Sequence, residues 1–292
     1  MGRQNTAILV GIVEQKAHIF KNEETGENEE AILCIHTVRG VKNAHDGNRI
    51  VKHEYPLIIA QMKHIISGIE SWEVGDIVAI KGSFYSRKIS KKMICPECGR
   101  EKKTNGLLSY VAPIYAKRIA HYDSTDDALK ELLHNKEISN QAILIGTVMN
   151  NPSSYRIESG LIVTQYQVVT NRKLKIKADS PETKMDYIWV KSFGDQAVED
   201  KLRLRHDSIV LIDGYLQSRN IKRKIKCPDC GYFYGYNDTT MELVPYDCEY
   251  LQGTFMTNEM LEEEFGMDIE KIKEKVKREV KDNHAEKDVN KE

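Results

Sequence analysis

The chain has 292 residues, of which 40% are apolar and 30% are charged, and its formal net charge is −1. This balance is typical of a globular protein and excludes an intrinsically disordered one. At roughly 100–200 residues per domain, the length predicts two domains. No run approaches the roughly 18 apolar residues that a membrane span needs, and the first residues do not resemble a secretory signal. We therefore expect a cytoplasmic protein that is not held in a membrane.

The near-zero net charge hides an asymmetry along the chain. Residues 257–292 carry 12 acidic and 8 basic side chains, so the part before them is net positive. The basic side chains of that part are also clustered. The net charge therefore does not exclude a nucleic acid as the partner.

Two long segments of the chain occur twice. NTAILVGIVEQ at 5–15 matches NQAILIGTVMN at 140–150, and residues 74–99 match residues 206–231. The offsets of 135 and 132 residues are too long for a solenoid repeat, so they indicate duplication of one domain. We predict domain one at 1–120, a polar linker with a short helix at 121–139, domain two at 140–256, and a charged helical or disordered tail at 257–292.

Each copy reads as a series of short strands. Apolar, β-branched runs alternate with turn residues, and one short helix is expected in each copy, near 63–71 and 195–204. Five strands with a helix before the fourth strand is the order of the OB-fold, a small β-barrel. The sequence therefore predicts a mainly β protein of two tandem OB-fold barrels. Each barrel carries an extended hairpin, and a charged C-terminal helix follows.

Residues 187–219 carry a spaced motif. WVKSFGDQA at 189–197 precedes Leu204, and VLIDGYLQSR follows at 210–219. An aromatic strand, an FG-x-x-A helix start and this glycine-containing strand resemble the bacterial single-stranded DNA-binding protein family. The resemblance covers most of 140–220 and implies an OB-fold that binds single-stranded DNA. Copy one matches less well, with Ala60-Gln61 in place of FG, so the chain resembles a tandem duplication of the family domain with CxxC insertions.

The aromatic strand of copy two is the best candidate for stacking bases. Its alternation places Tyr187, Trp189, Lys191 and Phe193 on one face. Each stacked base would contribute about 1–3 kcal/mol. In the opposite register the rings would be core and Lys191 would be buried at a cost. The corresponding strand of copy one has Tyr55 as its ring, so we expect weaker binding there.

Three basic runs accompany the predicted strands, at 87–92, 172–177 and 219–226. Such runs bind phosphates without regard to sequence, although a single run is often just solvated surface. The predicted DNA-binding residues are Tyr187, Trp189, Lys191, Phe193, Tyr215, Arg219, Lys222, Arg223, Lys224, Arg172, Lys173, Tyr55, Arg87 and Lys88.

Four of the six cysteines form two C-P-x-C-G motifs, Cys95 with Cys98 and Cys227 with Cys230. Glycine permits the tight turn that aims two thiolates at a metal ion. Structural zinc takes four ligands, so a shared site requires both pairs to meet, within the chain or across a dimer. The alternatives are a local third ligand, such as His121 or Cys248, or pairs that bind no metal. We predict structural zinc on Cys95, Cys98, Cys227 and Cys230.

The predicted function is sequence-nonspecific binding and protection of single-stranded DNA, in replication or in transfer of a mobile element. We expect no enzyme, because the sequence lacks clustered acids, a phosphate-binding glycine loop and a nucleophile with its base. The duplication suggests an internal pseudo-dimer, and a homodimer would present four OB domains. The alternatives are an RNA-binding OB protein and a zinc-stapled scaffold that holds a partner protein.

Overall fold

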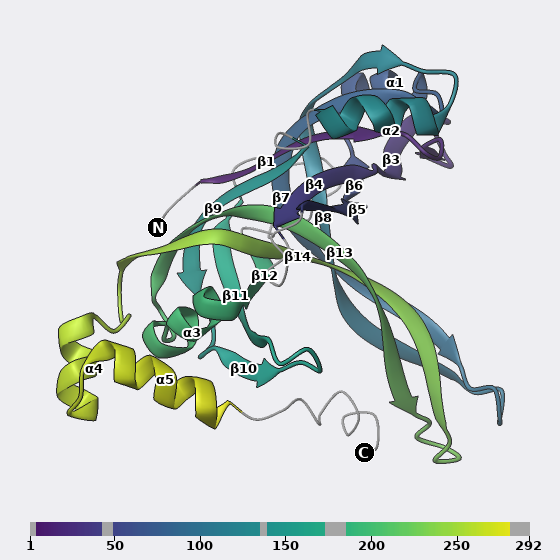
Figure 1. The fold of residues 1–292 in the computed structure, drawn as a ribbon. Helices are drawn as coiled ribbons and strands as arrows, with labels where there is room; N and C mark the ends of the chain where they lie inside the picture. The colour runs from purple at the N-terminus through teal and green to yellow at the C-terminus, as the bar shows by residue number, and fades with distance from the viewer. Residues whose placement is uncertain (1–3, 43–48, 135–138, 173–184, 281–292) are drawn as a thin grey trace.

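The computed structural model describes residues 4–42, 49–134, 139–172 and 185–280, and these residues form a mainly β protein of two lobes (Figure 1). The first lobe contains β1 (Asn5–Ile12), β2 (His18–Lys21), β3 (Asn28–Cys34), β4 (Thr37–Lys42), β5 (Arg49–Glu54), β6 (Leu57–Ala60), α1 (Lys63–Glu70), β7 (Asp76–Ile94) and β8 (Glu101–His121). After α2 (Thr125–His134), the second contains β9 (Asn140–Val148), β10 (Ser153–Arg156), β11 (Ile162–Asn171), β12 (Met185–Phe193), α3 (Gly194–Arg203), β13 (Ile209–Lys226) and β14 (Phe233–Gln252). The chain continues into α4 (Asn258–Phe265) and α5 (Ile269–Glu279).

Both lobes are OB-fold domains, as the strand order predicted. In domain two the pairings run around a ring, from β9 to β11, β12, β14, β13 and back to β9. Domain one follows the same order through β1, β7, β8, β6 and β3, and a bridge from Ile12 to His36 links its two ends. Helices α1 and α3 confirm the two predicted short helices, and α2 confirms the helix in the linker.

The two domains are joined through their first strands. β1 and β9 pair antiparallel, and Ala7 lies opposite Ala142, which is its own counterpart in the repeat. The domains are thus related by a pseudo-twofold axis through this pair. The pairing makes one continuous sheet in the order β8, β7, β1, β9, β13, β14, with a buried apolar core that spans both domains.

Two matched glycines allow the long hairpins to bend where they leave the barrels. A Cβ atom on Gly82 would lie 2.3 Å from the carbonyl oxygen of Ala112, and one on Gly214 would lie 2.1 Å from that of Val244. Both distances are impossible for a real side chain, so glycine is required at each bulge. Beyond these bends the β7–β8 and β13–β14 hairpins extend away from the barrels together (Figure 1).

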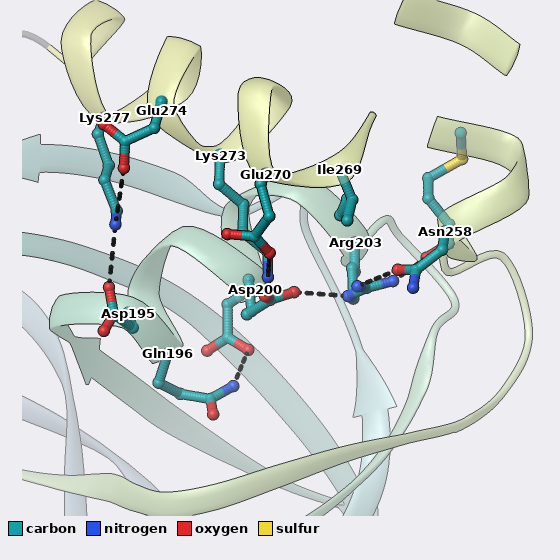
Figure 2. Close-up of polar contacts among 12 residues, drawn as sticks. Asp195, Gln196, Asp200, Arg203, Asn258, Ile269, Glu270, Lys273, Glu274 and Lys277 are labelled. Atoms are coloured by element: carbon teal, nitrogen blue, oxygen red, sulfur yellow. Dashed lines mark hydrogen bonds and ion pairs between the residues drawn. The ribbon is translucent and has the colours of Figure 1, made fainter. Parts of the chain in front are cut away.

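The two C-terminal helices pack on α3 of domain two. Leu261 of α4 and Ile272 of α5 are fully buried in a cluster that includes Val198 and Leu202 of α3. Figure 2 shows charged residues at the rim of this contact, where Lys277 reaches Asp195 at 3.2 Å. This charged segment is therefore amphipathic, and its apolar side belongs to the body of domain two.

Within the described ranges, the helices are too short and too polar for any of them to cross a membrane.

Candidate nucleic-acid interface and cysteine cluster

The aromatic strand of domain two presents its rings on the outer side of the barrel. Ile188 and Val190 are fully buried in the core, so the alternative register is wrong. Trp189 is 38% exposed, and Tyr187 and Phe193 are partly exposed. Gln165 and Gln167 of the neighbouring strand β11 lie opposite Lys191 and Trp189. The face therefore combines accessible rings with polar amides, as a base-stacking surface requires.

Strand β10 adds a ring that sequence reasoning missed. Tyr155 lies opposite Val163, which in turn lies opposite Phe193, so Tyr155 is on the same face of the sheet. The ammonium group of Lys191 lies 5.5 Å from the centre of the Tyr155 ring. Lys191, a predicted DNA contact, is only 5% exposed, so its ammonium group is buried rather than displayed on this face. The alternation of SSYR at 153–156 was the available signal, but it was too short to establish a face.

Arg172, a predicted phosphate contact, is instead buried between the domains. Its guanidinium pairs with Asp186, donates to the carbonyl oxygen of Ser86 at 3.0 Å and covers the Tyr85 ring at 4.3 Å. The backbone N–H of Ser86 donates to Asp186, and the hydroxyl of Ser86 accepts from the N–H of Tyr187, both at 2.9 Å. These bonds attach the start of β12 to β7 of domain one.

The pseudo-twofold axis repeats this junction on the other side. Glu54 accepts from Arg39 at 3.3 Å and from the backbone N–H of Ser218 at 3.1 Å, and Tyr55 donates its N–H to Ser218 at 2.7 Å. Arg39 lies 3.7 Å above the ring of Tyr215. The structure thus places Tyr215 in the interdomain contact, where it is 6% exposed and burial raises its pKa to about 12.

The equivalent face of domain one is mostly filled. Tyr55 is 42% exposed and stacks on His36 at 4.8 Å, but Ile59 is buried against Tyr85 and Tyr110. The hairpin of domain one thus covers the strand that corresponds to the aromatic strand of domain two.

The predicted cations of the hairpins fall into two groups. Arg87 and Arg219 each bind a glutamate, Glu30 and Glu242 respectively, through two nitrogens. Arg223 pairs with Asp238 at 2.8 Å. In the second group, the side chains of Lys88, Lys222 and Lys224 are exposed. Lys173 lies outside the described residues.

A charge pair joins the two hairpins. Lys91 of the first hairpin pairs with Asp238 of the second, and Arg223 pairs with the same carboxylate from the neighbouring strand of its own hairpin. Burial would raise the pKa of Asp238, but the hydrogen bonds from these two cations outweigh it and hold the pKa below its ordinary value. Arg223 therefore helps to hold Asp238 in the position where it binds Lys91.

The four predicted cysteines meet at the hairpin tips. Their sulfur atoms all lie within 4.8 Å of one another, with 3.7 Å between Cys95 and Cys230 and 3.6 Å between Cys98 and Cys227. Four sulfurs at about 2.3 Å from a tetrahedral zinc ion lie about 3.8 Å apart. The cluster thus has the size of a four-thiolate metal site, and each domain contributes two of its ligands.

The electrostatics of the cluster also fit a cation. A backbone N–H of Cys230 is the largest of the influences that lower the pKa of Cys227 to about 7. For Cys230 a backbone hydrogen bond at Tyr232 acts in the same direction, but desolvation and the neighbouring thiols raise the pKa to about 12. The pKa of Cys98 is raised as well, so four thiolates at neutral pH would need a bound cation to compensate their charge.

Fold, aromatic face and cysteine cluster together define a tandem OB-fold protein with a row of accessible rings and four cysteines that could hold a metal ion. Residues 139–227 match the model of the single-strand binding protein family. Domain two therefore resembles that family over these residues, and the chain carries a second copy of the same fold.

Solved structures show the same architecture over nearly the whole chain. A deletion mutant of the single-stranded DNA binding protein from Thermus aquaticus matches with a TM-score of 0.59 and 13% identity, covering 88% of this chain and 98% of that one. The wild-type protein from Thermus aquaticus matches with a TM-score of 0.55 and 13% identity, covering 86% and 95%. At this identity the likeness establishes the fold. Among curated proteins, none matches the sequence of this chain.

Proposed function

We propose that this protein binds single-stranded DNA without strong sequence preference, mainly through the outer face of domain two. The observation that carries the proposal is the row of accessible rings on β12, extended by Tyr155 on β10, in the domain that matches the single-strand binding family. Stacking on such rings tolerates any base, and exposed lysines on the hairpins supply phosphate contacts.

Competition binding separates this function from its alternatives. The full chain is titrated with labelled oligo-dT, and unlabelled oligo-dT, oligo-U and duplex DNA compete at two salt concentrations. The proposal predicts that oligo-dT competes best, that duplex competes poorly and that affinity falls with salt. Stronger competition by oligo-U would indicate an RNA-binding protein, and absence of binding to every nucleic acid would favour a protein scaffold.

We further propose that the four cysteines hold one structural zinc ion, which clasps the two hairpins. The sulfur spacing supports zinc, because four sulfurs around one tetrahedral zinc ion have about this separation. Metal analysis of protein purified under reducing conditions tests this proposal.

A homodimer is the third part of the proposal. The outer face of the six-stranded sheet exposes Ile8 at 39% and Tyr115 at 50%, and a twofold contact through this face would bury both side chains. Its charged residues differ between the domains: Lys81 and Lys117 in domain one, and Asp213, Asp247 and Glu249 in domain two. A twofold contact of this face would set the lysines of each copy against the carboxylates of the other. Sedimentation of the wild type and of Ile8→Asp tests it, since a wild-type monomer would refute the dimer.

A further inference from the structure

The junction between the domains connects the aromatic strand of one to the hairpin of the other. The first residues of β12 bind β7 at Ser86, whose hydroxyl accepts the N–H of Tyr187. At this point β7 is leaving the barrel of domain one to form the hairpin. Tyr187 and the other rings of domain two are therefore adjacent to the base of the hairpin of domain one.

An exposed basic face begins at this junction. Side chains two residues apart point to the same side of a strand, about 7 Å apart along it. Beyond Ser86, the positions on this side of β7 are Lys88, Ser90 and Lys92, and all three are exposed. Lys92 also pairs at 3.4 Å with Glu101, which is half-exposed, so a phosphate would compete with this surface pair. Across the hairpin, Asn105 lies opposite Ser90 and the exposed Lys103 lies opposite Lys92. The opposite side of β7 contains Lys91, which faces the second hairpin and pairs with Asp238.

The pseudo-twofold axis also brings the hairpin of domain two next to domain one, but different residues line this second junction. There Ser218 binds Tyr55, and the side of β13 that follows contains Lys222 and Lys224. That basic face adjoins domain one, where the hairpin residues Tyr85 and Tyr110 cover the corresponding strand. Only the first arrangement among the described residues joins several accessible rings to a lysine face.

We propose that the bound strand crosses between the domains: its bases stack on the rings of domain two, and its phosphates continue along Lys88 and Lys92 of the domain-one hairpin. This inference rests on the proposed function and defines its route. It also gives the cysteine cluster a role. The cluster and the junction at Ser86 would keep the domain-one hairpin in a fixed position relative to the rings of domain two.

Charge reversal on the two hairpins tests the route with a matched control. The full chain carries either Lys88→Glu with Lys92→Glu or, as the control, Lys222→Glu with Lys224→Glu on the equivalent face of the other hairpin. The ligand is oligo-dT of about 12 nucleotides, which is within the range that one OB-fold binds. Binding is measured by fluorescence anisotropy at several salt concentrations, and thermal melting verifies that each variant is folded.

The route predicts that the first variant binds more weakly and that its slope of log affinity against log salt falls by about 1.4, at about 0.7 for each lost phosphate contact. The control should lower the slope less than the first variant does, because the strand beside Lys222 and Lys224 is covered by Tyr85 and Tyr110. An equal or larger loss in the control would overturn the route, because the strand would then follow the hairpin of domain two itself. Absence of binding by the wild type would instead refute the proposed function.

Discussion

The cluster of Cys95, Cys98, Cys227 and Cys230 leads to the most quantitative prediction. Cys95→Ser removes one of four sulfurs whose separations of 3.6 and 3.7 Å agree with the roughly 3.8 Å of a tetrahedral zinc site. If one ion is shared, the wild type should contain one zinc per chain and the variant should lose most of it. Without the ion, the hairpins retain the pair of Lys91 with Asp238, and a partly exposed pair contributes about 1 kcal/mol or less.

The assay is metal analysis by mass spectrometry on protein purified with a reducing agent, followed by thermal melting with and without a chelator. Cys34→Ser is the matched control, because Cys34 lies on β3, outside the cluster. The account predicts that the chelator and Cys95→Ser lower the melting temperature by similar amounts, that Cys34→Ser keeps its zinc, and that both barrels stay folded. Zinc-free wild type, or a Cys95→Ser variant that keeps its zinc, would refute a shared site.

Two further predictions concern domain two. Ile272→Ala should lower the free energy of unfolding in urea by about 2–5 kcal/mol, because Ile272 is fully buried against α3. Met260→Ala is the control and should cost little, because Met260 is 46% exposed. Equal costs in the two variants would refute the packing of α5. Burial raises the pKa of Asp200 above its ordinary value of 3.8, although Gln196 and Tyr250 donate hydrogen bonds to its carboxylate. The unfolded state therefore loses this proton at a lower pH than the folded state does, so the free energy of unfolding falls as the pH rises above 3.8. Asp200→Asn should therefore gain stability relative to wild type between pH 4 and pH 7.5, measured by urea unfolding, and a parallel decline in both proteins would contradict this.

The fold could be predicted largely because the sequence contains two copies of one domain, and each copy can be compared with the other. Each strand run, and the glycines at 82 and 214, occur twice at nearly constant spacing, so local patterns that are ambiguous alone reinforce one another. The register of β12 was also predictable, because alternation over nine residues with Ile188 and Val190 on one side distinguishes the core face from the outer face.

What could not be predicted depends on contacts between distant parts of the chain. A basic run indicates phosphate binding, but Arg172 is paired with Asp186 and enclosed by Ser86 and Tyr85 from the other domain. Likewise, no motif reveals that β1 and β9 pair, and this pairing brings the hairpins together. The shared cysteine cluster therefore remained one alternative among several until the structure placed all four sulfurs together.

Affinity of the Trp189→Ala variant for oligo-dT tests the central claim most directly. Trp189 is 38% exposed on the aromatic face of domain two, and Tyr55, at 42%, is the exposed ring at the corresponding face of domain one, where it matches Tyr187 in the repeat. The account predicts that Trp189→Ala weakens binding by about 1–3 kcal/mol in a folded protein, and that Tyr55→Ala has a much smaller effect. Equal losses in the two variants, or wild-type affinity in Trp189→Ala, would contradict the assignment of the binding face to domain two.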